Sequence, residues 1–274
     1  MKVKVLCWLL LSCLIFSFSV AICTAGETMR YQKIEDVPKE KWQTLAKKKI
    51  YFGHQSVGFN IIAGMQAVMK EHPQIQLNIV ESRRDMDTGG AFVHSKVGEN
   101  RKPDTKINDF VKVINQDLGV TPDAAALKFC YVDAYDKIDI NDVFQQYKEA
   151  MSSLRKEHPS LTIIHFTMPL RTQPISWKTK AKLFLGKELW EFTDNIKRNQ
   201  FNQLLLQEYQ GKEPVFDIAG YEATTDDGRQ MTFQYKEKKY LAMLAEYSAD
   251  GGHLNKKGEK WIAGNLLVFL VNNI

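Results

Sequence analysis

The sequence predicts a single α/β domain of three layers, in which helices cover both faces of a mostly parallel five-stranded sheet. Short apolar runs alternate with longer segments of helical period, a pattern typical of strands joined by crossover helices. No internal repeat, low-complexity tract or linker divides the chain. Hydrophobic residues at 44% and charged residues at 25% are usual for a globular domain. The expected strands span residues 49–52, 75–80, 125–132, 161–168 and 214–218.

Four helices are expected between and after these strands. The first places Ile61, Ile62 and Met65 on one face and ends before Pro73, which disfavours helical backbone at the residue preceding it. The four helices span residues 59–70, 142–156, 193–209 and 259–271. Segments 83–103 and 171–188 are expected to be irregular loops at the carboxyl ends of strands, where α/β folds place their sites.

The first 25 residues differ from the rest. Lys2 and Lys4 precede an apolar run over residues 5–22, and Cys23-Thr24-Ala25 offers small residues for a signal peptidase. We therefore expect residues 1–25 to be a signal peptide and residues 26–274 to form one domain, exported to the periplasm or secreted. An uncleaved N-terminal membrane anchor is the alternative, because the run is nearly long enough to span a bilayer.

Cysteine usage and charge restrict the domain further. Cys130 is the only cysteine after residue 25, so no intramolecular disulfide is expected there, and its apolar surroundings indicate a buried strand residue. Lys2 and Lys4 contribute two of the net +5 charges, which leaves a mildly basic domain. The basic clusters lack interleaved aromatics, so we expect no nucleic-acid partner.

A candidate nucleophile follows the first strand. The run Gly53-His54-Gln55-Ser56 passes from strand through glycine into a helix. This would place Ser56 at a helix N-terminus, with its N–H facing an incoming oxyanion. Serine is also a favoured helix cap, and on this motif alone the capping interpretation is preferred.

The end of the chain supplies the groups that a serine nucleophile needs. Asp250 lies three residues before His253 on a glycine-bearing loop just ahead of the last helix. A serine hydroxyl needs an imidazole base, and the imidazole needs a carboxylate to fix its tautomer. His253 and Asp250 suit these two roles.

These two motifs resemble the first and last sequence blocks of the SGNH/GDSL hydrolase superfamily. The residues that carry the resemblance are Gly53-x-x-Ser56-x-Gly58 and Asp250-x-x-His253-Leu254-Asn255-x-x-Gly258. The resemblance implies a flavodoxin-like three-layer fold and ester or thioester hydrolysis through an acyl-enzyme, with no cofactor. It assigns Ser56 as nucleophile, His253 as general base and Asp250 as the carboxylate that orients it.

The sequence also departs from the superfamily. His54-Gln55 stand where an Asp usually precedes the serine, and Val132 stands where the third block carries an Asn that donates to the oxyanion. We therefore assign the Gly98 N–H and the Asn100 side chain as replacement donors, a glycine turn with Asn in a left-handed conformation being the alternative. Asp133 is either a site residue or a hydrogen-bond partner at a helix start.

Three other functions remain open. The same triad could serve an acyltransferase on an exported glycan, and a non-catalytic carbohydrate-binding module could keep the fold without turnover. A metal-dependent phosphoesterase or amidase is the third, although no metal-binding spacing is present. Its ligands would come from His54, His94, His165, His253, Asp133 and Asp250. The expected substrate is a small-molecule or glycan-linked ester. The aromatic residues Trp177, Trp190 and Phe192 either stack on a sugar or cover an acyl chain, or they belong to the core.

Overall fold

The computed structural model describes residues 31–274, apart from residues 85, 87–88, 174–178, 180–184 and 186–188. The expected signal peptide, residues 1–25, lies outside the described residues, as does Trp177. Within residues 31–274, apart from those gaps, none of the helices combines the length and apolar composition needed to cross a membrane.

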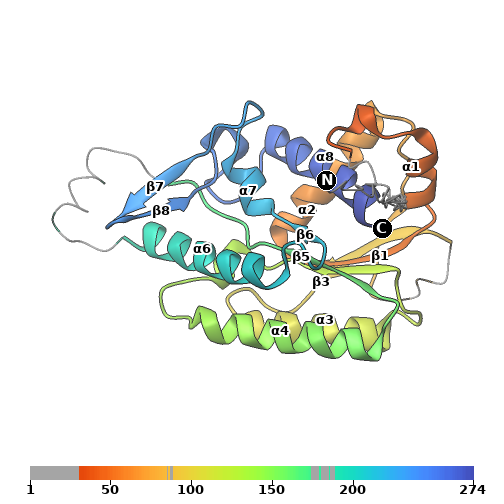
Figure 1. The fold of residues 1–274 in the computed structure, drawn as a ribbon, viewed down its shortest axis with the longest axis horizontal. Helices are drawn as coiled ribbons and strands as arrows, with labels where there is room; N and C mark the ends of the chain where they lie inside the picture. Colours follow the sequence, from red (N-terminus) through yellow and green to blue (C-terminus); the bar gives the residue numbers. More distant parts are fainter. Residues whose placement is uncertain (1–30, 85, 87–88, 174–178, 180–184, 186–188) are drawn as a thin grey trace, which may run out of the picture. The chain divides into compact units, whose positions relative to one another are not determined.

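The centre of the described domain is a parallel sheet of six strands in the order β2-β3-β1-β4-β5-β6 (Figure 1). The expected α/β fold is confirmed, but the expected number of five strands is wrong. The additional strand, β3, pairs in parallel with both β1 and β2 inside the segment that we expected to be a loop. The strands are β1 (Lys49–His54), β2 (Ile79–Glu81), β3 (Ala91–Lys96), β4 (Ala124–Leu127), β5 (Thr162–Phe166) and β6 (Val215–Phe216).

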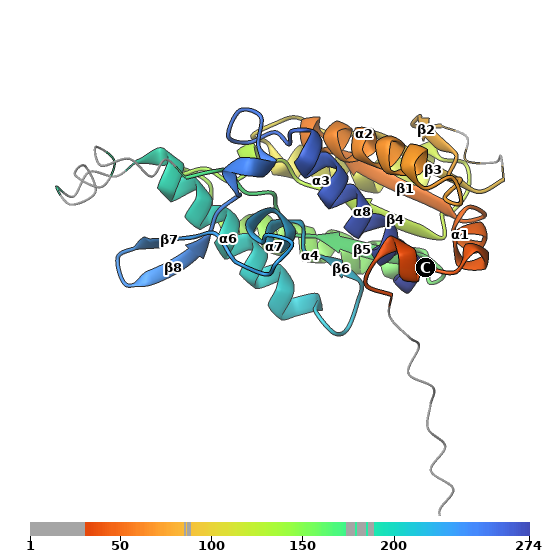
Figure 2. The same cartoon turned by 90° about the horizontal axis from the view of Figure 1, so that it is seen from above.

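Helices form a layer on each side of this sheet (Figures 1 and 2). Alternate side chains of β1 define the two faces, because Phe52 packs with the core under α2 and α8 whereas Tyr51 packs with the core under α3 and α4. All four predicted helices are present and extend a few residues beyond their predicted bounds. The helices are α1 (Lys39–Leu45), α2 (Ser56–Glu71), α3 (Pro103–Lys112), α4 (Ile140–Glu157), α6 (Trp190–Tyr209), α7 (Ile218–Ala223) and α8 (Lys256–Asn273).

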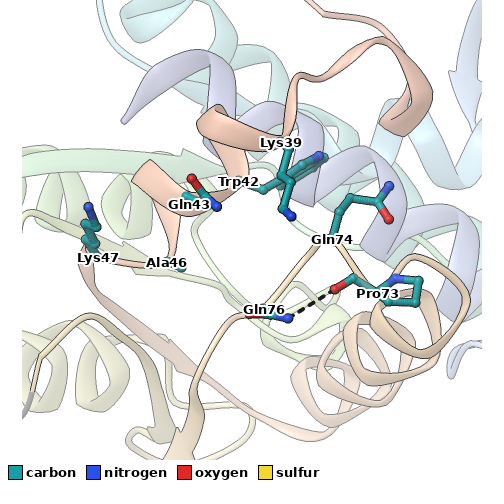
Figure 3. A pocket seen from close by; sticks show the side chains of 8 residues that line it. All are labelled: Lys39, Trp42, Gln43, Ala46, Lys47, Pro73, Gln74 and Gln76. Carbon is teal, nitrogen blue, oxygen red and sulfur yellow. Dashed lines mark hydrogen bonds between the residues drawn. The ribbon is translucent and has the colours of Figure 1, made fainter.

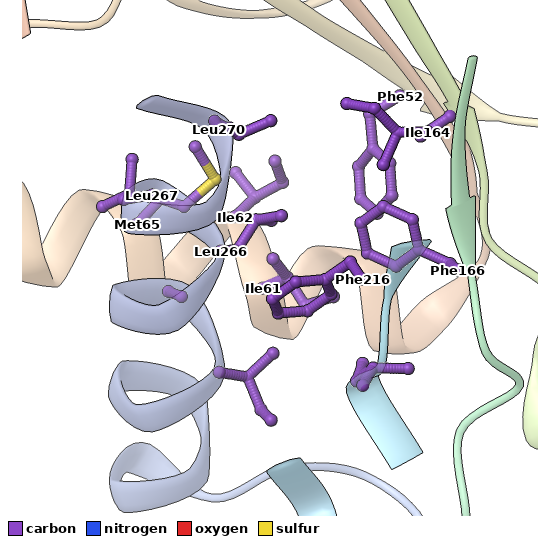
Figure 4. Packing of buried hydrophobic residues seen from close by; sticks show 14 of the residues in the cluster. Phe52, Ile61, Ile62, Met65, Ile164, Phe166, Phe216, Leu266, Leu267 and Leu270 are labelled. Carbon is purple, nitrogen blue, oxygen red and sulfur yellow. The ribbon is translucent and has the colours of Figure 1, made fainter. Parts of the chain in front are cut away.

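Helices α2 and α8, which lie far apart in the sequence, pack against each other. Apolar side chains of both helices meet the phenylalanines of the sheet (Figure 4), and burying each such side chain contributes roughly 1.5–3 kcal/mol. A Cβ on Gly64 would lie 2.1 Å from the Glu259 carbonyl oxygen, so only glycine permits this close approach. The residues labelled from α2 are Ile61, Ile62 and Met65, and those from α8 are Leu266, Leu267 and Leu270.

Two further elements were not expected from the sequence. Strand β4 ends at Leu127, and a 3-10 turn over Tyr131–Asp133 replaces the end of the strand predicted to reach residue 132. An antiparallel hairpin of β7 (Thr232–Tyr235) and β8 (Lys238–Leu241) lies outside the main sheet. The backbone of Leu241 exchanges two hydrogen bonds with the Asn199 amide, which fixes the hairpin to α6.

Candidate active site

Ser56 lies at the carboxyl edge of the sheet, as the first residue of α2 and two residues beyond β1. The preceding residue anchors it, because the Gln55 amide donates to the carbonyl oxygens of Val97 and Gly98, each at 2.8 Å. The first N–H groups of a helix have no intrahelical acceptor, and the Ser56 N–H donates to none of the described residues. The N–H of Ser56 is therefore available to a ligand.

Asp250 and His253 lie on the loop that leads into α8, and this loop fixes its own carboxylate. The Gly252 and His253 N–H groups both donate to Asp250 Oδ1, at 2.9 and 2.8 Å. At the end of the loop, the Asn255 side chain accepts from the Gly258 N–H and caps α8. The position of Asp250 is thus set by backbone that is continuous with a packed helix.

The structure brings the three predicted catalytic residues into one hydrogen-bonded series. His253 Nε2 lies 3.0 Å from Ser56 Oγ, and His253 Nδ1 lies 2.7 Å from Asp250 Oδ2. The N–H of His253, followed by its side chain, holds the pKa of the Asp250 carboxyl down at about 2. The carboxylate is therefore ionised at neutral pH and accepts from Nδ1–H, which leaves Nε2 free to accept the serine proton.

Tyr131 supports the imidazole from the side. Its ring lies edge-to-face with the His253 ring at a centroid distance of 5.5 Å. A Cβ on Gly252 would lie 2.7 Å from the Tyr131 ring, so glycine is needed for the loop to cross it. The buried Arg198 guanidinium donates to the Tyr131 carbonyl oxygen at 2.7 Å. Sequence reasoning missed this support, because no motif distinguishes an aromatic residue after a strand from a core residue.

The structure corrects one of the predicted oxyanion donors. The Gly98 N–H donates to Asp109 Oδ2 at 2.8 Å, and Asp109 also accepts from both terminal nitrogens of Arg83. Gly98 has a φ of 53°, and a Cβ added to it would lie 2.4 Å from the backbone nitrogen of Lys106. The backbone conformation and the close packing thus explain why position 98 is a glycine. Its N–H is already used in the hydrogen bond to Asp109.

The side chain of Asn100 has a different environment. The buried Lys106 ammonium donates to Asn100 Oδ1 at 2.9 Å, which identifies the other end of the amide as the nitrogen. That Nδ2 forms no hydrogen bond with a described residue, and Asn100 is exposed. The loop carrying it is held near Ser56 by the Gln55 contacts.

Asp133 has a structural environment. It is fully buried and accepts from the Cys130 and Arg101 N–H groups, at 2.7 and 2.9 Å, as well as from Lys106 Nζ. Both carboxylate oxygens already accept from groups of the chain, so of the two roles expected for Asp133 the hydrogen-bond partner is favoured. Cys130, a free buried cysteine, places its Sγ 4.0 Å from Ser56 Oγ.

The histidines proposed as metal ligands do not gather around one point. His54 Nε2 lies 3.0 Å from His94 Nδ1, whereas His165 contacts Tyr147 and Glu213 elsewhere in the core. Among the described residues, no three His, Cys, Asp or Glu side chains are placed to hold a metal ion. Burial lowers the pKa of both His54 and His165 to about 3, so both are neutral at physiological pH.

Two ionisable side chains are buried in the core beside the site. Lys128 follows β4, its N–H donates to the Gly53 carbonyl oxygen at 2.9 Å, and burial lowers its pKa to about 8. Glu222 of α7 accepts from the Leu170 N–H at 2.6 Å, and burial raises its pKa to about 8. The burial of these two residues is not predictable from the sequence, since isolated charged residues are usually exposed.

A pocket away from the triad lies at the opposite edge of the sheet (Figure 3). Its lining comes from α1, from the segment that leads into β1, and from the loop that follows α2. Helix α2 separates this pocket from Ser56, because Ser56 begins the helix and Pro73 follows its end. The labelled lining residues are Lys39, Trp42, Gln43, Ala46, Lys47, Pro73, Gln74 and Gln76.

No family model and no curated protein matches the chain. Solved structures do, at low identity. A putative platelet activating factor from Streptococcus pneumonia is 14% identical with a TM-score of 0.48, over 85% of this chain and 90% of that one. A GDSL-like lipase from Bacteroides thetaiotaomicron is 9% identical with a TM-score of 0.47, over 84% and 92%. The acetyl xylan esterase AlAXEase is 16% identical with a TM-score of 0.47, over 80% and 97%. At these sequence identities the similarity concerns the fold alone.

Proposed function

We propose that the chain is an exported serine hydrolase of the SGNH/GDSL type, which cleaves an ester through Ser56, His253 and Asp250. The observation that carries the proposal is the pair of contacts made by one imidazole, 3.0 Å to Ser56 Oγ and 2.7 Å to Asp250 Oδ2. These are the distances at which a base can take the proton of a serine while a carboxylate holds its tautomer.

The reaction proceeds in two halves. In the first, His253 Nε2 takes the proton of Ser56 Oγ, Oγ attacks the ester carbonyl carbon, and the leaving alcohol departs with the proton from His253. In the second, water attacks the acyl-serine carbonyl and gives a proton to His253. Collapse of this second tetrahedral intermediate returns the proton to Ser56 and releases the acid.

The oxyanion of each tetrahedral intermediate needs donors that the protein does not already use. The Ser56 N–H and the Asn100 amide nitrogen meet this condition among the described residues. In this proposal Lys106 fixes which end of the Asn100 amide faces the substrate. A preorganised donor of this kind contributes roughly 10²–10³-fold in kcat.

Hydrolysis is favoured over acyl transfer by the exposure of the triad. The side chains of Asp250 and His253 are 57% and 34% exposed, so water can reach the acyl-enzyme. Export itself depends on residues 1–25, and mass spectrometry of the protein recovered from the extracytoplasmic fraction tests cleavage after Ala25.

The proposal is tested with a fluorophosphonate probe and p-nitrophenyl acetate, which report the nucleophile and turnover separately. Labelling and turnover are expected in the wild type and should be lost in Ser56→Ala and His253→Ala. Ser153→Ala is the matched control, because Ser153 lies on α4 and its hydroxyl donates to Glu157 of the same helix. A folded wild type that neither reacts nor turns over would contradict the proposal and favour a binding module.

A further inference from the structure

Three cationic side chains at the carboxyl edge of the sheet lie over aromatic rings. The guanidinium carbon of Arg171 is 5.2 Å from the Tyr131 ring centroid and 5.5 Å from that of Trp190. The remaining two contacts are Arg101 over Tyr135 at 4.3 Å and Lys96 over Phe59 at 5.4 Å. Cation–π contacts hold a charge in place without neutralising it.

Arg171 is attached to the loop that carries the triad. Its Nε donates to the Gly251 carbonyl oxygen at 3.3 Å, two residues before His253. Its backbone is fixed as well, because the Asn195 amide bonds both the N–H and the carbonyl oxygen of Arg171, at 3.1 and 2.8 Å. The guanidinium is therefore preorganised beside the catalytic histidine.

The other two cations are linked to Ser56 through the backbone at the same edge of the sheet. Lys96 ends β3 and pairs in register with His54, two residues before the serine. The Arg101 N–H donates to Asp133, whose second oxygen accepts from Cys130, and the Cys130 thiol lies 4.0 Å from Ser56 Oγ.

These charges are not neutralised by carboxylates. In the part of the chain that the structure describes, Lys96, Arg101 and Arg171 form no ion pair, although pairs such as Lys102 with Glu99 form close by. Three carboxylates near these cations are already engaged: Lys106 pairs with Asp133, His253 with Asp250, and Arg198 with Asp194, whose charge also acts on Arg101. Each of these three cations therefore keeps a charge that no carboxylate of the described residues pairs with.

We propose that Lys96, Arg101 and Arg171 form an anion-binding rim, and that the substrate is an ester on a glycan bearing carboxylates. This rests on the proposed function, since the rim lies at the same edge of the sheet as the nucleophile of that reaction. A sugar polymer is favoured because Trp190, beside Arg171, is 55% exposed and offers an aromatic face on which a sugar ring can stack. The rim concentrates the polyanion near Ser56 and holds a uronate residue while the neighbouring ester is cleaved.

Turnover of two acetylated oligosaccharides tests the proposal, one an oligouronate and the other a neutral xylo-oligosaccharide of similar length. At about 10 mM NaCl, kcat/KM should favour the oligouronate by about tenfold or more, and at about 150 mM the preference should shrink because salt screens exposed charges. Arg171→Gln and Arg101→Gln should each lower the ratio of the two kcat/KM values by roughly threefold, and the double variant by about tenfold.

Lys47→Gln is the matched control for charge. Lys47 is exposed and precedes β1, at the opposite edge of the sheet, so the same loss of one charge should leave the ratio unchanged. A ratio near one in the wild type, or a ratio that all three Gln variants alter equally, would overturn the rim. Faster cleavage of an acetylated anionic lipid than of the oligouronate would also overturn the glycan assignment.

Binding separates failure of the rim from failure of the proposed function. Calorimetry with Ser56→Ala and an oligouronate lacking acetyl groups requires no turnover. The expected result is a Kd that rises with salt and rises again, roughly three- to tenfold, when Arg171→Gln is added. Absence of p-nitrophenyl acetate turnover in the folded wild type, with this binding retained in Ser56→Ala, would refute the hydrolase alone, and absence of binding would refute the rim.

Discussion

The ammonium of Lys106 lies 2.5 Å from Asp133 Oδ2, and neither side chain is exposed. Replacing Asp133 with Asn would leave a buried cation without its counter-charge, and such a loss costs roughly 3–5 kcal/mol. We expect Asp133→Asn to lower the free energy of unfolding by about this amount in urea titrations. Asn100 should also lose its fixed orientation, because Lys106 positions its amide.

An exposed ion pair in the same region provides the comparison. Lys102 and Glu99 are 59% and 65% exposed, and such exposed pairs add little to stability because water and salt screen them. Lys102→Gln should therefore change the stability little. Equal effects of the two substitutions would mean that the buried pair is not the element holding the loop at residues 98–101.

A substitution of Asp250 tests the predicted tautomer of the histidine. The N–H groups of Gly252 and His253 both donate to Oδ1, so in Asp250→Asn the amide oxygen must stay at that position. The amide nitrogen then faces His253 Nδ1 and donates to it, which forces the imidazole proton onto Nε2. An Nε2 that carries a proton cannot accept one from Ser56.

We therefore expect Asp250→Asn to lower kcat for p-nitrophenyl acetate by roughly 10³–10⁴-fold, with little change in KM. Asp142→Asn, an exposed substitution in the first turn of α4, should leave both parameters unchanged. A kcat reduced by less than about tenfold would contradict the assignment of Asp250 as the orienting carboxylate.

The features that could be predicted from the sequence are those that depend on residue spacing within one segment. The spacing of Asp250 and His253 predicted one loop carrying both, and the structure places them against Ser56. The strands and helices of the core were predictable for the same reason, because apolar periods report burial. β3 was not predicted, since a short strand containing His94, Ser95 and Lys96 has no clear alternation although its first five residues are buried.

Other features depend on tertiary contacts that no local pattern encodes. Nothing in the sequence distinguishes the buried Lys106, Lys128 and Glu222 from charged residues on a surface. The hydrogen bond from the Gly98 N–H to Asp109, eleven residues later, is one such contact, and it leaves this N–H unavailable to an oxyanion. The rim cations were unrecognised for a related reason, because their loops follow different strands.

Two helical glycines are expected to respond in opposite directions to the same substitution. Alanine at an exposed helix position stabilises by roughly 0.5–1 kcal/mol relative to glycine. At Gly64 in α2 the new Cβ would lie 2.1 Å from the Glu259 carbonyl oxygen, whereas at Gly264 in α8 the nearest atom, Ile34 Cδ1, is 3.6 Å away.

Gly64→Ala should therefore separate α2 from α8 and destabilise the protein by about 1–3 kcal/mol, and Gly264→Ala should stabilise it by roughly 0.5–1 kcal/mol. Thermal unfolding followed by circular dichroism measures both. Because Ser56 begins α2 and His253 precedes α8, Gly64→Ala should also reduce turnover. Stabilisation by both substitutions would show that the two helices can move apart at no cost.

The buried carboxyl of Glu222 should make stability depend on pH. Burial raises its pKa to about 8, against roughly 4.3 in an unfolded chain. Between these values the native state keeps a proton that the unfolded state has lost, so the free energy of unfolding falls as pH rises, by at most about 1.4 kcal/mol per pH unit. Glu222→Gln removes this titration and keeps an oxygen for the Leu170 N–H.

The difference in stability between Glu222→Gln and the wild type should therefore grow in favour of the variant from about pH 5 to about pH 8. Urea titrations at several values between about pH 5 and about pH 7 measure it, because Lys128, with a pKa of about 8, begins to lose its proton above that range. Glu149→Gln, at an exposed position of α4, should give a curve parallel to the wild type. A parallel curve for Glu222→Gln as well would mean that the Glu222 carboxyl is already ionised in the native core, and that the Lys128 ammonium stabilises its charge.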